Sequence, residues 1–167
     1  NSQNQHQRAQ AFHEESLLLR RQLGNTEGMA ISLSNLGMVA YSQGDNQRAR
    51  SLFLESQTLL LKLNDQRGLA NIFANLGNVE RSQGHYAKAI AHYLESIATS
   101  KAIGERRNIT ECLAELADTL LRQDHATYAA HLYGLAEILR EQIGTTVEPA
   151  EQPAYDQSIA SLRAQLG

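Results

Sequence analysis

Residues 68–104 read GLANIFANLGNVERSQGHYAKAIAHYLESIATSKAIG and contain two helical patterns around one glycine turn. In the first half, apolar side chains recur at mixed three- and four-residue steps, at Leu69, Ile72, Phe73, Leu76 and Val79. This is the spacing of an amphipathic helix. Gly84 supplies a turn, and a second apolar series then runs to Gly104. The stretch therefore predicts two antiparallel helices joined by a short connection.

The same pattern recurs along the chain with a period of forty residues. Its columns include Gly24, Asn64, Gly104 and Gly144; Leu36, Leu76 and Leu116; and Ala9, Ala49, Ala89 and Ala129. Repeats of this length cannot bury their apolar faces alone and stack on their neighbours, which predicts a solenoid. Such arrays usually present a surface to a partner, so the period favours binding over catalysis.

The whole chain, 1–167, is expected to form a single domain. The expected elements are an orphan second helix (7–23), three helix pairs (28–63, 68–103 and 108–143) and a terminal helix (153–166). The fold class is therefore all-α, a right-handed solenoid of antiparallel helix pairs with a C-terminal capping helix. Because the first unit has only its second helix and the sequence begins with Asn1, we interpret it as a piece of a longer protein.

Composition narrows the function classes. The net charge of −3 and the pI near 6.1 give no electrostatic footprint for nucleic acid or an anionic membrane. Cys112 is the only cysteine, which excludes an internal disulfide and fits a reducing compartment. No signal peptide or membrane-spanning run is present in the sequence. We expect a cytoplasmic protein without direct nucleic-acid or membrane contacts.

Five columns recur in register between residues 7 and 144. They are a Leu-Gly or Leu-Ala step (Leu36-Gly37, Leu76-Gly77, Leu116-Ala117), a turn glycine (Gly44, Gly84), an alanine (Ala49, Ala89, Ala129), an aromatic residue (Phe53, Tyr93, Tyr133) and a small residue (Ser56, Ser96, Ala136). This set resembles the tetratricopeptide repeat. The usual repeat has 34 residues, so we expect second helices that are longer by more than one turn.

The C-terminal part carries a second resemblance. Residues 129–144, beginning AAHLYGLAE, and residues 153–167 look like the end of large bacterial signalling regulators. In those proteins a STAND-type ATPase module is followed by such repeats. The resemblance implies a regulatory sensor arm that reads a protein or a small ligand.

The sequence offers no catalytic, cofactor or metal site. It contains no Gly-Lys-Ser/Thr phosphate loop and no pair of histidines at i, i+4. His85 and His125 are interpreted as solvated turn residues. Glu111, Glu115 and Asp118 share one helix face, which we interpret as an exposed acidic stripe because no nucleophile accompanies it. Cys112 lies beside apolar residues and is predicted to be a small core residue. The protein is therefore not expected to be an enzyme.

The resemblance implies that the first helices line an inner, concave groove. Carried over by position, the inner face comprises Ser34, Met38 and Tyr41, then Asn71, Asn75, Asn78 and Arg81, then Glu111, Glu115, Asp118 and Arg122. Its asparagines can hydrogen-bond an extended peptide backbone, and its acidic end favours a basic segment. Arg81 is the main inward cation. The alternative, that these residues are only the solvated side of amphipathic helices, stays open.

Two functions follow from this pattern. The first is a non-catalytic module of a bacterial signalling or transcriptional regulator that binds a protein or peptide on its concave face. The second is a self-association scaffold, a homodimer formed through the N-terminal helix. The apolar residues of that helix are Phe12, Leu17, Leu18 and Leu19.

Overall fold

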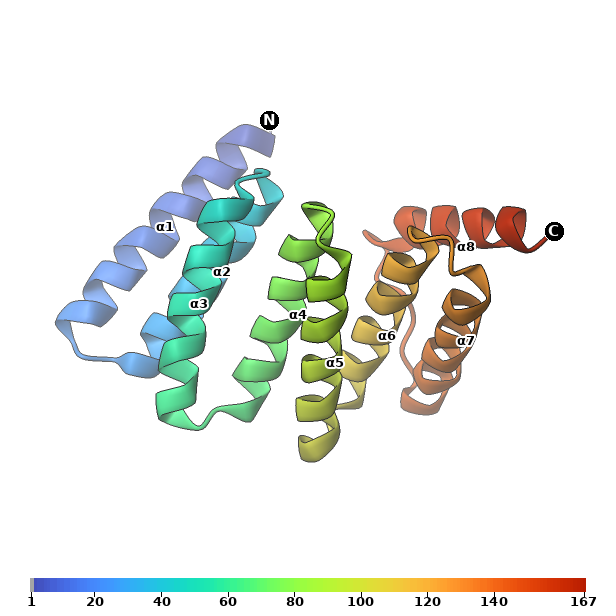
Figure 1. The fold of residues 1–167 in the computed structure, drawn as a ribbon. Helices are drawn as coiled ribbons and strands as arrows, with labels where there is room; N and C mark the ends of the chain where they lie inside the picture. The colour runs from blue at the N-terminus through green and yellow to red at the C-terminus, as the bar shows by residue number, and fades with distance from the viewer. Residues whose placement is uncertain (1) are drawn as a thin grey trace.

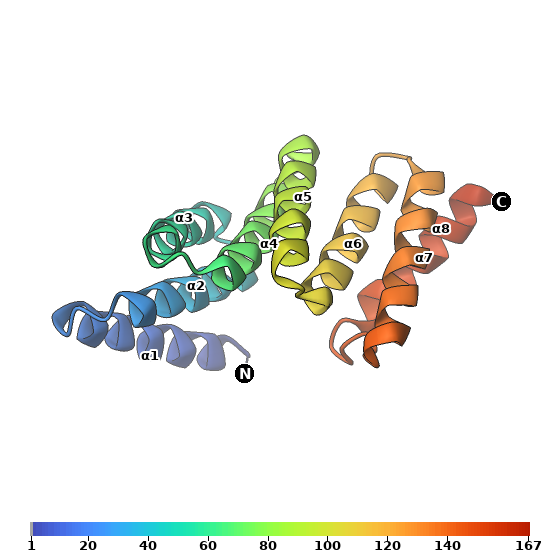
Figure 2. The same ribbon diagram turned by 90° about the horizontal axis from the view of Figure 1, so that it is seen from below.

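The computed structural model describes residues 2–167, with side chains from residue 11 onward, so Ala9 lies outside the described side chains. Within that range the chain forms α1 (Ser2–Gln22), α2 (Thr26–Ser42), α3 (Asn46–Leu63), α4 (Gln66–Ser82), α5 (Tyr86–Ile103), α6 (Arg106–Leu121), α7 (Ala126–Ile143) and α8 (Gln152–Leu166). The helices α1 to α7 follow one another in a curved array, and α8 lies across its C-terminal end (Figures 1 and 2). The predicted all-α solenoid is confirmed.

The first helices of the first two pairs, α2 and α4, begin at side-chain caps that the apolar spacing does not reveal, whereas Glu105 before α6 makes no such bond. The Asn25 side-chain oxygen accepts a hydrogen bond from the Gly28 backbone N–H at 2.8 Å, and the Asp65 carboxylate accepts one from Gly68 at 2.9 Å. Each cap satisfies one of the N–H groups that a helix start leaves free. The helices α2 and α4 consequently begin at residues 26 and 66, two residues before the apolar patterns that start at 28 and 68.

Helix ends repeat at half the forty-residue period. Positions 24, 44, 64, 84, 104, 124 and 144 all have left-handed backbone conformations, with φ between 53° and 80°. Five of them are glycines, whereas Asn64 and Asp124 have φ of 53° and 61°. A side chain at positive φ is strained, because its Cβ approaches the backbone.

Replacing Asp124 by glycine should therefore stabilise the fold. We expect Asp124→Gly to raise the free energy of unfolding by about 0.5 kcal/mol, because glycine adopts the left-handed conformation without a steric cost. Asp124→Ala should lower the free energy of unfolding, because alanine adopts the left-handed conformation less readily than aspartate does. Urea denaturation of the three proteins measures both changes, and equal effects of the two substitutions would contradict the backbone explanation.

The glycine of the Leu-Gly step lies against an aromatic ring of its own helix pair. A Cβ added at Gly77 would lie 2.5 Å from Cε1 of Tyr93, and one at Gly37 would lie 2.5 Å from Cε1 of Phe53. The Phe53 ring also belongs to a buried cluster that includes Phe73 of the next pair. The aromatic side chain thus fills space within a pair as well as between pairs.

The two helices of each unit have similar lengths, and the lengthening of second helices relative to the usual repeat stays a prediction. The helices α2 and α4 have 17 residues, whereas α3 and α5 have 18. Forty residues exceed the usual 34 by six, so an excess confined to second helices would make them longer by more than a turn.

Candidate partner-binding groove

A hollow of about 770 Å³ lies on the side of the array formed by the first helices. The helix α4 contributes one wall with Asn75, Asn78 and Arg81. The opposite walls come from α6, from the loop at 144–151 and from α8. We call this hollow the α4–α6–α8 groove.

Most of the residues expected on the inner face line this groove. They are Met38, Asn75, Asn78, Arg81, Glu111, Glu115, Asp118 and Arg122. Ser34, Tyr41 and Asn71 do not belong to its lining. Further lining residues that the sequence reasoning missed are Glu151, Ala154, Tyr155, Gln157, Ser158 and Ser161. Helical spacing predicts which face of α4 and α6 is polar, but it contains no signal for where the chain returns after Gly144.

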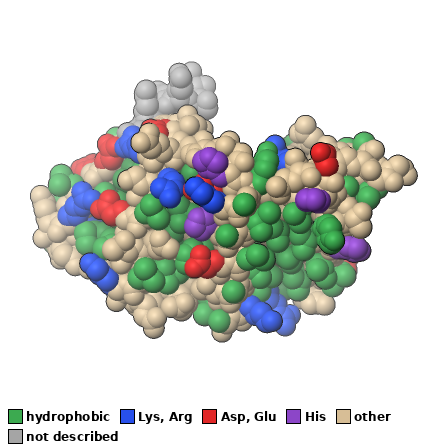
Figure 3. Space-filling model, in the orientation of Figure 1, with side chains coloured by type: hydrophobic (Ala, Val, Ile, Leu, Met, Phe, Trp, Pro, Cys, Tyr) green, Lys and Arg blue, Asp and Glu red, His purple; other side chains and the backbone are tan. Residues whose placement is uncertain are grey.

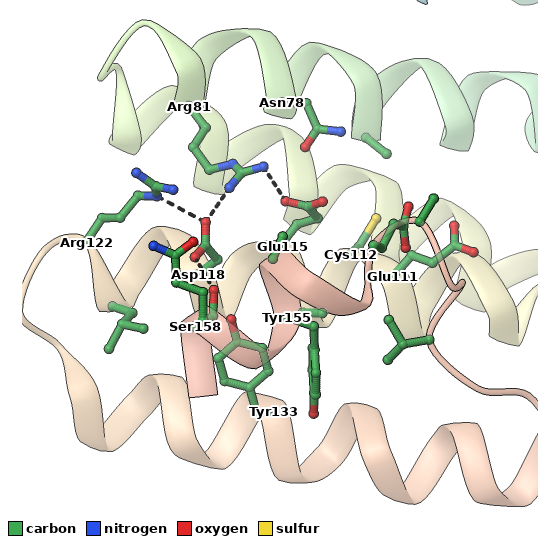
Figure 4. A pocket seen from close by; sticks show the side chains of 18 of the residues that line it. Asn78, Arg81, Glu111, Cys112, Glu115, Asp118, Arg122, Tyr133, Tyr155 and Ser158 are labelled. Atoms are coloured by element: carbon green, nitrogen blue, oxygen red, sulfur yellow. Dashed lines mark hydrogen bonds and ion pairs between the residues drawn. The ribbon is translucent and has the colours of Figure 1, made fainter. Parts of the chain in front are cut away.

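An arginine-centred cluster occupies the floor of the groove (Figure 4). Arg81 Nη2 lies 2.6 Å from Glu115 Oε2, and Arg81 Nη1 forms an ion pair with Asp118. Arg122 Nε donates to Asp118 Oδ2 at 3.0 Å, and the Ser158 hydroxyl donates to Oδ1 of the same carboxylate at 2.9 Å. This cluster connects α4, α6 and α8 through a single carboxylate.

The cluster corrects two sequence-based interpretations. The Arg81 and Asp118 side chains are only 18% and 16% exposed, and Glu115 is partly exposed. The acidic face of α6 is therefore not a fully solvated stripe, since two of its carboxylates are paired and half enclosed. Arg81 is likewise not a free cation for a ligand, because Glu115 and Asp118 already bind it.

Burial and the neighbouring charges act in opposite directions on the pKa values of this cluster. Burial would raise the pKa of Asp118, but hydrogen bonding from Arg122 and the charge of Arg81 outweigh it and lower that pKa. At Glu115, burial predominates over the attraction of Arg81, so its pKa is raised. Burial disfavours the charged form of Arg81, yet Glu115 and Asp118 raise its pKa and keep it protonated.

Asn78 offers a directed donor. The Tyr93 hydroxyl donates to Asn78 Oδ1 at 2.6 Å, and burial raises the pKa of Tyr93, which keeps that hydroxyl protonated. With its oxygen engaged, the Asn78 amide has its NH₂ group for further bonds. Asn75, one helical turn earlier on α4, places a second amide on the same wall.

The helix α8 closes one side of the groove. The Tyr155 hydroxyl donates to Glu137 Oε1 at 2.8 Å, and its ring packs edge-to-face on Tyr133 with centroids 5.6 Å apart. The Arg140 guanidinium lies 5.2 Å from the Tyr155 ring centroid. Leu162 is buried where α8 packs against the cluster of α6 and α7. The expected capping helix thus also shapes the groove.

Cys112 lies within α6, whereas His85 and His125 lie at the turns before α5 and α7. Cys112 is buried, as predicted, and burial raises the pKa of its thiol to about 11, which disfavours the nucleophilic thiolate. His85 is exposed at the turn before α5, as predicted, and its Nδ1 lies 2.8 Å from the buried carboxylate of Glu80. His125 is exposed. Among the side chains from residue 11 onward, no three acidic, histidine or cysteine groups could hold a metal ion.

The paired helices, glycine–aromatic contacts and inner groove define a helical-repeat protein. Two family models, both described as tetratricopeptide repeat, match residues 1–62 and 69–103. The chain therefore carries tetratricopeptide repeats, which generally mediate protein binding in non-catalytic scaffolds.

Comparison with solved structures supports the same fold. The crystal structure of BtubC (BKLC) from P. vanneervenii is similar, with a TM-score of 0.70 and 20% sequence identity. The match covers 83% of this chain and 58% of that chain, so this chain spans little more than half of its length. At this identity the likeness shows the fold alone. No curated protein matched the sequence. Across residues 2–167, no helix combines the length and hydrophobicity needed to cross a bilayer.

Proposed function

We propose that this chain is a non-catalytic module that binds a peptide segment of a partner protein in the α4–α6–α8 groove. The convergence of polar side chains from α4, α6 and α8 on one hollow carries this proposal. Asn75 can both donate to and accept from a peptide backbone, and the Asn78 NH₂ group can donate to one.

The charges of the groove favour a basic ligand segment. Asp118 is balanced by Arg81 and Arg122. Glu115 pairs with Arg81 too, but burial, repulsion by Asp118 and repulsion between Glu115 and Glu151 together raise its pKa. A lysine or arginine side chain placed between these two carboxylates would relieve that repulsion. The ligand is therefore an extended peptide with at least one basic residue.

The cellular setting of this module rests on the resemblance of residues 129–144 and 153–167 to bacterial regulators. We place the chain in a cytoplasmic signalling or transcriptional regulator with a STAND-type ATPase module. The full open reading frame tests this placement. Flanking ATPase and DNA-binding modules support it, and a frame without them refutes it.

The groove itself is tested by substituting one wall residue. Peptides are selected from a random phage-displayed library against the immobilised chain, and their affinities are then measured by fluorescence polarisation. We expect Asn75→Arg to weaken binding by about tenfold or more, because it fills the groove and repels a basic ligand. The matched control is Asn35→Arg, one repeat earlier and outside the groove lining.

We expect the control to bind the selected peptides as tightly as the unmodified chain does. Equal losses in both variants would show that the peptides bind elsewhere on the inner face. Unchanged binding in Asn75→Arg, or a library that yields no peptide, would refute the groove as the binding site.

The second candidate function is self-association through α1. Phe12 and Leu19 are exposed, whereas Leu52 and Leu59, their equivalents in α3, pack against the core. Leu17, which the sequence reasoning assigned to the same free stripe, is instead buried with Leu33 of α2. The exposed side chains of α1 thus occupy positions that are packed against a first helix in α3. In a homodimer, a second copy of the chain would pack against them instead.

A further inference from the structure

The outer face of α7 carries large apolar side chains at three positions where the other second helices have charged or small residues. Tyr128, Leu135 and Ile138 are 67%, 50% and 52% exposed. The equivalent residues are Arg48, Glu55 and Thr58 in α3, and Lys88, Glu95 and Ala98 in α5. Compared with the equivalent positions of α3 and α5, α7 has large apolar side chains at two positions, 128 and 135, where both other helices have charged residues.

Further stacking of helix pairs would not cover these side chains. Glu55 and Thr58 of α3 remain exposed although two more pairs follow, and Glu95 of α5 remains exposed although one does. This distinguishes the outer face of α7 from α1, where Phe12 and Leu19 occupy positions that are packed in α3. The apolar side chains of α7 thus lie on a surface that the solenoid leaves open in every unit.

A neighbouring leucine extends this surface onto α5. In the first units, Arg48 of α3 pairs with Glu14 of α1 at 2.8 Å, which shows which positions face each other across adjacent second helices. The equivalent pair between α7 and α5 is Tyr128 and Leu94, and Leu94 is 52% exposed. We call Leu94, Tyr128, Leu135 and Ile138 the α5–α7 patch. Figure 3 shows a continuous hydrophobic area over these two helices.

The size of the patch indicates an interface. Four large side chains that are each about half exposed present roughly 400–500 Å² of apolar surface, which is the range in which patches on monomers are often functional. Two copies face to face would cover roughly twice that area, and with their rims they approach the lower limit of about 1,200 Å² for a specific complex. No member of the patch is charged, and the charged residue that borders it on α5, Lys101, is the equivalent of the Arg21 that pairs with Glu55. Lys101 therefore lies at the edge of the patch beside Leu135 and stays solvated if the copies meet through the four apolar side chains.

We propose that the α5–α7 patch is the contact surface of a homodimer in which the same patch of each copy meets the other. Such a contact is closed by a two-fold axis and needs no second type of surface. Because the patch lies on second helices and the α4–α6–α8 groove on first helices, the dimer leaves both grooves open. It would present two equivalent grooves to a partner that carries repeated segments, which raises avidity without new contacts.

The decisive variant replaces residues of α7 by those found at the same positions in the other units. Tyr128→Lys/Leu135→Glu/Ile138→Thr takes its residues from Lys88, Glu95 and Thr58. Sedimentation velocity of the full chain from low to high micromolar concentration measures the monomer–dimer equilibrium. We expect the unmodified chain to dimerise in this range and the variant to dimerise at least about tenfold more weakly, because both patches lose apolar anchors. Far-UV circular dichroism checks that the variant keeps its helices.

Phe12→Glu/Leu19→Glu tests the competing surface on α1, and because we assign the dimer to α7 instead of α1, we expect this variant to dimerise as the unmodified chain does. An unmodified chain that stays monomeric at high micromolar concentration overturns the proposal. So does a dimer that survives in the α7 variant, which would assign self-association to α1 if the α1 variant is monomeric. Loss of the dimer in both variants also overturns it, since association would then not depend on this patch specifically.

Discussion

Replacing Arg81 by methionine is expected to lower the free energy of unfolding by about 2–3 kcal/mol, because it leaves two partly enclosed carboxylates without their shared counter-ion. Glu115 and Asp118 both pair with this guanidinium. Methionine keeps much of the volume of the arginine stem, so the loss reflects charge more than a cavity. Arg122 still pairs with Asp118, which keeps the expected loss below the largest values for buried pairs. Urea denaturation at neutral pH measures the change.

The pH dependence of this loss has a defined sign. In the unmodified chain the lowered pKa of Asp118 stabilises the fold above its unfolded value, about 4, and this contribution disappears as the pH falls through the folded value. Without Arg81, the pKa values of the Asp118 and Glu115 carboxyl groups should both be higher than in the unmodified chain, although the hydrogen bonds from Arg122 and Ser158 still act on Asp118. Protonation of these carboxylates then removes their unpaired charge in the variant. The loss of unfolding free energy caused by Arg81→Met should therefore become smaller between pH 7 and pH about 4.5.

Arg67→Met provides the matched control. Arg67 also pairs with a carboxylate, Glu105, at 3.0 Å, but its side chain is mostly exposed. Exposed pairs contribute between about 0 and 1 kcal/mol, so this substitution should change stability little at any pH. A deficit of Arg81→Met that is no larger than that of Arg67→Met, or that grows on acidification, would refute the assigned role of the cluster.

The fold could be predicted because its determinants are local and repeated. The Leu-Gly steps, turn glycines and aromatic residues each act within one helix pair, so the periodic pattern contains most of the information that positions α2 to α7. The caps at Asn25 and Asp65 were also visible as residue types, but apolar spacing alone does not mark them. The tertiary repeat therefore follows from chemistry that acts within about forty residues.

The groove could be predicted only in part, because its remaining features depend on long-range placement. Asn75 and Glu115 follow from helical position, whereas Ser158 joins the groove only because α8 crosses back over α6. The same holds for Arg81, whose position predicts an inward direction but not the pairing that satisfies it. The α5–α7 patch could not be predicted from the apolar residues alone. Recognising it requires knowing which positions of the repeat are exposed and which are packed, and the structure supplies that distinction.

Gly77→Ala is expected to destabilise the fold by about 1–3 kcal/mol, although alanine is the better helix former, because the added methyl group overpacks a closed helix crossing. The ideal Cβ would lie 2.5 Å from the Tyr93 ring, and Tyr93 is fully buried and hydrogen-bonded to Asn78. The ring therefore cannot move aside, and α4 and α5 must separate. Ala117 occupies the equivalent place beside Tyr133, which shows that separation is possible and limits the cost.

Gly134→Ala separates this steric effect from helix propensity. Gly134 lies inside α7, is exposed, and has no atom within 4 Å of its added Cβ. The same chemical change should therefore stabilise the chain here by about 0.5–1 kcal/mol, since alanine restricts the unfolded backbone and favours the helix. Thermal denaturation compares the two variants, and the midpoints should shift in opposite directions. Shifts of the same sign would mean that helix propensity governs both sites, and that the glycine–aromatic contact does not fix the approach of the helices within each pair.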